Sequence, residues 1–214
     1  MCIRDRIPSD IPTAIAILRT GHRLKVDVGL VTIGKNKQYF LEVCSIGLLS
    51  ALFPAADDIQ HGNLSRIGDL LSTLVASPPA EIHLLLDGKQ KINTLGHVVL
   101  ISNTAYIGPH FRVGTPDSIS DGLLDVLFFA DLSKMELLDY AVQTTGRGDN
   151  LEDERIQHFH VRRVEVFTNP AMPVMADGLA LGEGEIQISV KRHTLAVMVP
   201  APVSEQPDTG SPDE

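Results

Sequence analysis

Cysteine is scarce in this chain, which contains only Cys2 and Cys44. The two residues form no CxxC pair and no other metal-ligand spacing, and they cannot build a disulfide framework. Long apolar runs are missing too, since no stretch approaches the roughly 18 apolar residues of a membrane span. The opening segment MCIRDR is charged and has no apolar core, so it does not read as a secretory signal. We therefore expect a cytoplasmic protein.

Basic residues are also few. Lys and Arg number 18 against 27 Asp and Glu, which gives a formal net charge of -9. Because neutralising nucleic-acid phosphates requires clustered Lys and Arg, we predict no nucleic-acid partner. The 214 residues, 43% of them hydrophobic, are enough to bury a core and exclude a disordered chain. The stretch 201–214 is the exception: its Pro, Ser, Gly and unpaired acids predict a disordered acidic tail.

The rest of the chain alternates between strand-like and helix-like patterns. Helices are predicted over 8–20, 64–76 and 132–144. The first is capped by Ser9 or Asp10 and ended by Gly21. Its apolar residues fall on one face that we expect to be buried: Ile11, Ile15 and Leu18. Strands are predicted over 24–31, 38–44, 81–86, 96–102, 123–129, 161–167, 185–190 and 194–200. Many short strands with turn residues between them indicate a mainly β, α+β fold, a β-sandwich or barrel with a few peripheral helices.

Three segments carry polar residues that could do chemistry. They are SNTAYIG (102–108), PDSISDGLLDV (116–126) and MADGLALG (175–182). Taken singly, each has a simple structural explanation. An Asp-Gly pair between strands is usually a turn, and Asn103 is more often a strand-end hydrogen-bonding residue than a catalytic one.

Taken in order, the motifs resemble the C-terminal domain of the diacylglycerol kinase and sphingosine kinase superfamily, closest to its bacterial soluble lipid kinases. The residues that carry the resemblance are YFLEVCSIGLLSAL (39–52), ISNTAYIG (101–108), TPDSISDGLLDVLFF (115–129), MADG (175–178) and HTLAVMVP (193–200). The Pro-x-x-x-x-Asp-Gly-x-Leu-Asp-Val run is the most specific of them. The resemblance covers 7–200 and implies a two-layer β-sandwich that closes over a nucleotide-binding domain and accepts a lipid. Residues 1–6 fit neither the family nor a helix start and are interpreted as a non-native junction.

In that family a preceding domain carries a Gly-Gly-Asp-Gly-Thr loop whose backbone N–H groups cradle the ATP phosphates. This sequence contains no such loop, and its Gly146-Arg147-Gly148 triplet is too short to replace it. We interpret the chain as the C-terminal part of a longer kinase. ATP would be bound mainly by the preceding domain, and the chain alone would be inactive.

The resemblance also implies a magnesium site on the 118–123 loop. Its ligands would be the Asp121 carboxylate and the backbone carbonyls of Ser118 and Leu123. Hard oxygen donors on a turn suit Mg²⁺, which keeps several waters. The simpler interpretation is that Asp121 only caps the turn before the next strand. Asp125, at the start of that strand, is interpreted as structural.

The family's Asp-Gly-Glu motif supplies the base that takes the lipid hydroxyl proton. Here the matching residues are Asp177, Gly178 and Leu179. Leu179 occupies the base position and cannot accept a proton, which places activity in question. Asp177 is then the remaining candidate acceptor, directly or through water.

His158 and His160 alternate along one predicted strand and face the same way. Two such histidines could bind a metal, but the sequence places no third ligand. With the neighbouring arginines they more simply form a solvated basic edge. That edge could contact anionic lipid headgroups, so we expect transient contact with a membrane surface.

The sequence therefore predicts a fragment of an ATP-dependent lipid kinase, cytoplasmic and peripheral to the membrane, acting on diacylglycerol or a related lipid. The alternative is a catalytically inactive β-sandwich that binds a lipid or a protein. A metal-dependent hydrolase built on Asp121, Asp125 and Asp177 is a weaker third hypothesis. Whether the protein forms a homodimer is left open.

Overall fold

Antiparallel strands dominate the computed structural model, which describes residues 10–52, 63, 65, 67–107, 111–114, 119–130, 132–137, 139–140 and 155–200. The predicted junction 1–6 and the predicted tail 201–214 lie outside these residues. The helices are α2 (Ile11–Thr20) and α4 (Ile67–Ala76). The strands are β1 (His22–Ile33), β2 (Asn36–Phe40), β3 (Val43–Gly47), β4 (Ala80–Leu86), β5 (Gln90–Ser102), β6 (Tyr106–Ile107), β7 (Phe111–Arg112), β8 (Leu124–Ala130), β9 (Ile156–Val161), β10 (Arg163–Asn169), β11 (Pro173–Ala176), β12 (Leu179–Glu183) and β13 (Ile186–Val199).

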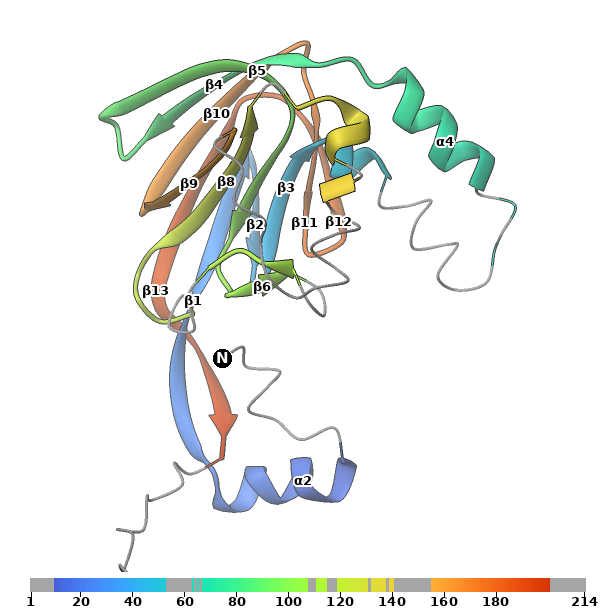
Figure 1. The fold of residues 1–214 in the computed structure, drawn as a ribbon. Coiled ribbons are helices and arrows are strands. Elements are labelled where there is room, and N and C mark those ends of the chain that lie inside the picture. Colours follow the sequence, from blue (N-terminus) through green and yellow to red (C-terminus); the bar gives the residue numbers. More distant parts are fainter. Residues whose placement is uncertain are drawn as a thin grey trace, which may run out of the picture.

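One strongly curled sheet contains eleven of these strands (Figure 1). Its main path runs β12-β11-β3-β5-β4-β10-β13-β1-β2, and every pairing is antiparallel. The long strand β5 also pairs with β8, which in turn pairs with β9. The sheet curls until β2 at one end of the path contacts β11 near the other. The predicted α+β sandwich is confirmed, and its two layers are parts of one sheet.

The core fills the space between these layers. Inward-facing Val, Ile, Leu and Phe side chains from both layers are almost completely buried, and the largest are Phe40, Phe128, Ile46, Ile82, Leu84, Ile101, Leu124, Ile186 and Ile188. A second, smaller cluster packs around Leu100, Leu127 and Phe129, where the ring of Tyr140 meets Phe129 edge-on at 5.8 Å between centroids.

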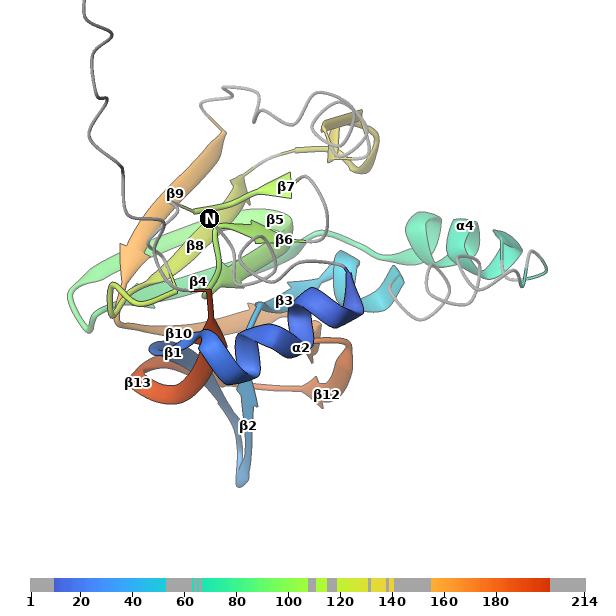
Figure 2. The ribbon, with the colours of Figure 1, turned by 90° about the horizontal axis from the view of Figure 1, so that it is seen from below.

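Helix α2 begins and ends where the sequence predicts, but its expected burial is wrong. Asp10 accepts a hydrogen bond from the Thr13 N–H at 2.9 Å, and Gly21 ends the helix. Of the helix, only Ile17 is buried, and three large apolar side chains are 71%, 55% and 67% exposed: Ile11, Ile15 and Leu18. The reason is position. The helix lies at the tip of a two-stranded ribbon of β1 and β13 that leaves the sheet (Figures 1 and 2).

Four predicted strands have different limits. The run 38–44 is divided into β2 and β3 by a bend at 41–42. The run 161–167 belongs to β9 and β10, which separate at Arg162. The runs 185–190 and 194–200 are one strand, β13, which pairs along β1. The remaining predicted elements are confirmed in the described residues, and of 132–144 the positions 134–137 and 139–140 are helical. Among the described residues, no helix combines the length and apolar character needed to cross a membrane.

Candidate functional site

Asp27 is a fully buried carboxylate in β1. It joins this strand to the 119–123 turn and to His193 in β13. Its Oδ2 accepts a hydrogen bond from the Gly122 N–H at 2.6 Å, and its Oδ1 accepts one from the His193 N–H at 2.6 Å. Its own N–H donates to the Ile119 carbonyl at 2.8 Å. The β1–β13 register shifts between Val26 and Val28, which brings the Asp27 side chain to the turn. Asp27 thereby fixes the 119–123 turn against both strands.

Asn103, directly after β5, links Asp27 to a second segment. Its Nδ2 donates to the Asp27 carbonyl and to the Leu41 carbonyl, both at 3.0 Å, and its N–H donates to the Glu42 carbonyl at 2.9 Å. The side chain is 0% exposed. Its Oδ1 accepts no hydrogen bond from the described residues. The interpretation of Asn103 as a strand-end hydrogen-bonding residue fits these contacts.

Asp177 anchors the same 41–43 segment from the other side. Its carboxylate accepts three backbone N–H groups, from Leu41 at 2.6 Å, Glu42 at 3.0 Å and Val43 at 2.9 Å. Asp177 and Gly178 form the turn between β11 and β12 with φ of 43° and 82°. The predicted role of Asp177 as a proton acceptor stays a prediction. Its contacts are those of a residue that shapes the backbone, because three of the roughly four lone-pair positions of the carboxylate accept backbone N–H groups.

Asp121 lies exposed at the tip of the turn that Asp27 holds. Its Oδ1 accepts the Leu123 N–H at 2.8 Å, the turn-capping role considered from the sequence. Partial burial raises the pKa of Asp121, and the nearby negative charges of Asp125 and Asp27 raise it further, while the Leu123 N–H and His160 act in the opposite direction. Closely spaced carboxylates of this kind favour a bound cation.

The donor set expected for Mg²⁺ is therefore present in part. Asp121 and Leu123 share one turn, which is held rigidly through Asp27. Ser118 lies outside the described residues. A hard carboxylate beside other negative charges fits a magnesium ion that keeps several of its waters.

Asp125 has two partners that the sequence did not connect to it. Its Oδ1 lies 2.8 Å from the Nε2 of His158 and 2.8 Å from the Nδ1 of His160. The interpretation of Asp125 as structural fits these two contacts, which tie β8 to β9. The basic edge expected around the two histidines thus includes a buried acid. Because Asp125 and Asp177 have separate partners, the structure does not gather Asp121, Asp125 and Asp177 into one hydrolase-like cluster.

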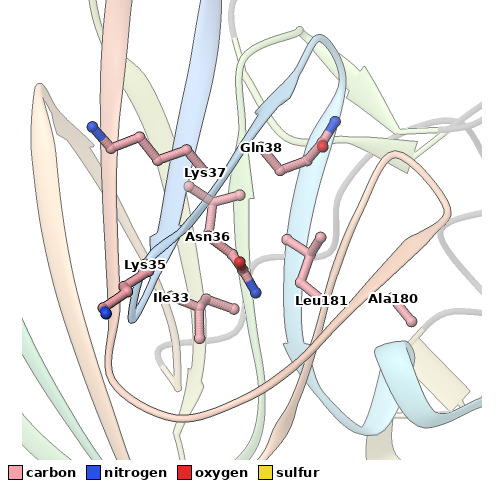
Figure 3. Close-up of a pocket in the computed structure, with 8 residues that line it drawn as sticks. Ile33, Lys35, Asn36, Lys37, Gln38, Ala180 and Leu181 are labelled. Atoms are coloured by element: carbon pink, nitrogen blue, oxygen red, sulfur yellow. The ribbon is translucent and has the colours of Figure 1, made fainter.

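Leu179, the residue in the expected base position, starts β12 and is 52% exposed. Two residues further along, Leu181 faces a cleft of about 380 Å³ between β12 and the β1–β2 hairpin. Figure 3 shows Asn36 between Ile33 and Leu181 in this view, with Lys35 and Lys37 extending from the hairpin. The cleft follows from the curl of the sheet, which brings β2 close to β11 and β12.

Asp27 is the residue that sequence reasoning missed. Strict alternation in LKVDVGLV places Asp27 on the same face as Lys25, which predicts an exposed position. The register shift between Val26 and Val28 accompanies its burial, and a buried carboxylate requires hydrogen-bond partners. The partners themselves could not be identified, since Gly122 and His193 are 95 and 166 residues away in sequence.

Comparison with known proteins places this arrangement in a family. Residues 46–199 match the family described as the YegS C-terminal NAD kinase beta sandwich-like domain. Among curated proteins, one named "Putative lipid kinase SAB0675c" from Staphylococcus aureus (strain bovine RF122 / ET3-1) is 28% identical over 169 residues, covering 76% of this chain and 54% of that protein. Another, "Putative lipid kinase SaurJH9_0749" from strain JH9, gives the same identity and coverage. The chain thus spans about half the length of these relatives.

Solved structures agree on the fold. A structure described as a diacylglycerol kinase from Bacillus anthracis str. Sterne superposes with a TM-score of 0.59 at 20% identity, covering 90% of this chain and 60% of that one. A second, described as a "putative diacylglycerol kinase" from the same strain, gives a TM-score of 0.67 at 22% identity, covering 90% and 63%. The sequence match over 46–199 shows that this chain belongs to the family of YegS C-terminal, NAD kinase-like β-sandwich domains.

Proposed function

We propose that the chain is the lipid-accepting C-terminal part of an ATP-dependent lipid kinase that phosphorylates a hydroxyl of diacylglycerol or a related lipid. The observation that carries this proposal is the buried Asp27–Asn103 connection. Through it, the 119–123 turn and the Asp177–Gly178 turn are fixed to the same group of strand ends. A cation site and a lipid hydroxyl must be held in one geometry for phosphoryl transfer, and rigid turns provide that.

Magnesium would be held by Asp121 with the carbonyls of Ser118 and Leu123, and when bound it would neutralise phosphate charge. The role of this chain is to present the oxygens of Asp121 and Leu123 on a turn that is hydrogen-bonded to β1. Asp27 does this by holding the Gly122 N–H with a fully buried carboxylate.

The lipid would enter through the cleft between β12 and the β1–β2 hairpin. The cleft is lined by apolar side chains, which include Val31, Ile33 and Leu181, and by the polar side chains of the hairpin: Lys35, Asn36, Lys37 and Gln38. Figure 3 shows the hairpin residues facing the strand that carries Leu181. Position 179 is two residues from Leu181, about 7 Å along an extended strand. An acyl chain in the cleft would therefore leave a hydroxyl near the turn at 177–178.

The missing base lowers the expected rate without excluding transfer. Phosphoryl transfer passes through a loose transition state in most analyses, so positioning and charge neutralisation supply most of the catalysis. General base catalysis typically adds about 10²–10⁴-fold. We therefore expect slow turnover with Leu179 and faster turnover when a carboxylate replaces it.

ATP would be bound by a nucleotide-binding domain, in keeping with the greater length of the relatives. The exposed apolar face of α2 is the surface on this chain that we assign to that contact, because Ile11, Ile15 and Leu18 are more than half exposed. Monomeric proteins rarely leave such a stripe uncovered.

The alternative function is an inactive lipid- or protein-binding domain. Two observations favour it. Leu179 cannot accept a proton, and Asp177 already accepts three backbone N–H groups. To separate the two functions, the N-terminal half of the S. aureus relative would be fused to this chain, and transfer of radiolabelled phosphate from ATP to a lipid panel would be measured. Leu179→Glu is compared with Leu95→Glu, a control at a similarly exposed leucine on β5.

We expect measurable transfer by the fusion, a rise of about 10²-fold with Leu179→Glu and no rise with Leu95→Glu. Activity seen only with Leu179→Glu would establish the inactive alternative. A fusion as active as its Leu179→Glu variant would end it. No transfer to any lipid by either protein would overturn the lipid kinase proposal.

A further inference from the structure

We propose that Asp125, His158 and His160 form a binding site for a divalent transition metal of the Zn²⁺ class, on the β8–β9 edge. The site is separate in its ligands from the expected magnesium turn. It also stands without the proposed kinase function, because it rests on the geometry of three side chains.

Strand pairing brings the three ligands together. Asp125 on β8 lies directly opposite His160 on β9, and His158 is opposite Leu127. Residues two apart on a strand point to the same face, so both imidazoles stand on the face that Asp125 occupies. A His-x-His pair with an acid on the adjacent strand therefore converges without any loop rearrangement.

The distances suit a metal. One nitrogen of each ring lies 2.8 Å from Asp125 Oδ1, and the three ligand atoms all lie within 4.8 Å of one another. The ring centroids are 4.6 Å apart and the ring planes are inclined by 52°, so the rings are not stacked flat. Zinc bonds of about 2.0–2.1 Å at tetrahedral angles separate neighbouring ligand atoms by about 3.3 Å. A small outward rotation of the two rings would admit the ion.

The three candidate ligands differ in exposure: the carboxylate is buried and the two imidazoles are partly exposed, as in a metal site at a protein surface. The Asp125 side chain is 3% exposed, whereas those of His158 and His160 are 38% and 48% exposed. The carboxylate is fixed and the two imidazoles can adjust. An ion bound there would keep a coordination position open to water, since these three residues supply only three ligands.

Ligand chemistry selects the class of metal. Imidazole nitrogen suits Zn²⁺, Co²⁺, Ni²⁺ and Cu²⁺, whereas Mg²⁺ prefers oxygen ligands throughout. A metal binds imidazole in its neutral form, so the Asp125 carboxylate would supply the negative charge among the three ligands. Asp121 is a second acid near His160 and Asp125. The cluster is therefore built for a divalent cation other than magnesium.

The experiment uses the 214-residue chain and the metal alone. Zn²⁺ is titrated by calorimetry with excess Mg²⁺ present, and Co²⁺ is titrated in parallel while its visible d–d absorption is recorded. His158→Ala and His160→Ala are compared with His83→Ala. His83 is a matched control because it is a partly exposed strand histidine whose Nδ1 lies 2.7 Å from an amide oxygen, Asn93 Oδ1, and not from a carboxylate. The substituted side chains are all partly exposed, so the variants should fold.

We expect one Zn²⁺ per chain, a tetrahedral Co²⁺ spectrum, and at least a tenfold loss of affinity in each of His158→Ala and His160→Ala but not in His83→Ala. Excess Mg²⁺ should not displace the zinc. Three results would each overturn the proposal: no stoichiometric Zn²⁺ binding by the wild type, equal affinity in all three variants, or displacement by Mg²⁺. The Co²⁺ spectrum of the wild type tests the proposal even if a variant fails to fold, because it reports the coordination geometry directly. Absence of lipid phosphorylation has no bearing on any of these readouts.

Discussion

Asn103 donates its Nδ2 to the backbone carbonyl of Asp27 at 3.0 Å, and both residues are completely buried. The contact joins the end of β5 to the middle of β1. From Asp27 the connection continues to Gly122, and from Asn103 it continues to the segment that Asp177 anchors. The polar site is therefore one cooperative unit, and its members should affect stability before they affect chemistry.

Replacing Asp27 by Asn should destabilise the domain strongly. The amide keeps one acceptor oxygen but presents an NH₂ group to one of the two backbone N–H donors, from Gly122 or His193. Hydrogen bonds to a charged group contribute about 1.5–3 kcal/mol each, and an unmatched buried donor adds its own cost. We expect the free energy of unfolding in urea to fall by about 2–4 kcal/mol.

Asp87→Asn is the matched control for that measurement. Asp87 also accepts two backbone N–H groups, from Arg162 at 2.9 Å and Arg163 at 2.8 Å, but it is exposed. Water can satisfy the groups that its substitution frees, so we expect a loss of about 1 kcal/mol or less. Equal losses for the two variants would show that the burial of Asp27 carries no special energetic weight.

Two glycines give a prediction about packing. A Cβ added at Gly29 on β1 would lie 2.0 Å from the ring of Phe40, which is 2% exposed, whereas one added at Gly68 in α4 meets nothing within 4 Å. Gly29→Ala should therefore cost about 1–3 kcal/mol by overpacking. Gly68→Ala should stabilise by up to about 1 kcal/mol through helix propensity. Thermal unfolding of both variants checks the pair, and a stable Gly29→Ala protein would contradict the close approach of β1 to Phe40.

Sequence reasoning succeeded where the determinants are local. The Asp10 cap, the end of α2 at Gly21 and the turns at Asp87-Gly88 and Asp177-Gly178 each depend on residues a few positions apart. Asp and Gly at those turns adopt positive φ, which their side chains tolerate. The strand-rich fold follows from the same local patterns.

Sequence reasoning failed for features that depend on residues far apart in the chain. The exposed face of α2 has the spacing of a buried one, and only its place at the tip of the β1–β13 ribbon shows otherwise. Asp125 and His158 are 33 residues apart, and no periodicity predicts which strand lies beside β8. The sequence therefore could not identify Asp125 as a third ligand for the two histidines, because this requires knowing that β8 pairs with β9.

Glu136 should make the folded state sensitive to acid. Its carboxylate accepts the Ser133 N–H at 2.9 Å and pairs with Arg155 at 2.8 Å. These contacts, those to Ser133 first, lower the pKa of Glu136 from 4.5 to about 2. A pKa depressed on folding means that the stabilisation is complete above pH 4.5 and is lost as the pH falls towards 2. NMR titration of the Glu136 carboxyl carbon should show its midpoint near the lower value.

Ser133→Ala tests the cause of that shift. Removal of the hydroxyl takes away the side-chain hydrogen bond of Ser133 to the Glu136 carboxylate, which is the largest cause of the lowered pKa. It also removes the acceptor of the Glu136 N–H, at 3.3 Å, and with it half of the capping box. We expect the Glu136 midpoint to move towards its ordinary value while the Arg155 contact keeps it somewhat low. A wild-type midpoint near 4.5 would show that these contacts do not persist in solution.

Cys44 should be unreactive in the folded protein. The side chain is 0% exposed on β3, and burial, with the nearby charge of Asp177, raises the pKa of its thiol. Only the thiolate attacks disulfide reagents, so neither access nor ionisation favours reaction. In a Cys2→Ser background, Ellman's reagent should find no thiol in native buffer and one thiol after denaturation. Rapid reaction of the native protein would contradict the packing of β3 between β5 and β11.

Asp177→Asn distinguishes an anchor from a base. If Asp177 mainly holds the Leu41, Glu42 and Val43 N–H groups, the amide should lower the free energy of unfolding by only about 1 kcal/mol, because the side chain is exposed and water can satisfy an N–H group that loses its acceptor. In the kinase fusion, the residual activity should then fall no further than the loss of folded protein explains. If Asp177 instead accepts the lipid proton, activity should fall by about 10² or more with little change in stability. Urea denaturation and phosphate transfer measured on the same preparation separate these outcomes. We expect the first, because a carboxylate that already accepts three backbone N–H groups is held in place to shape the turn beside position 179.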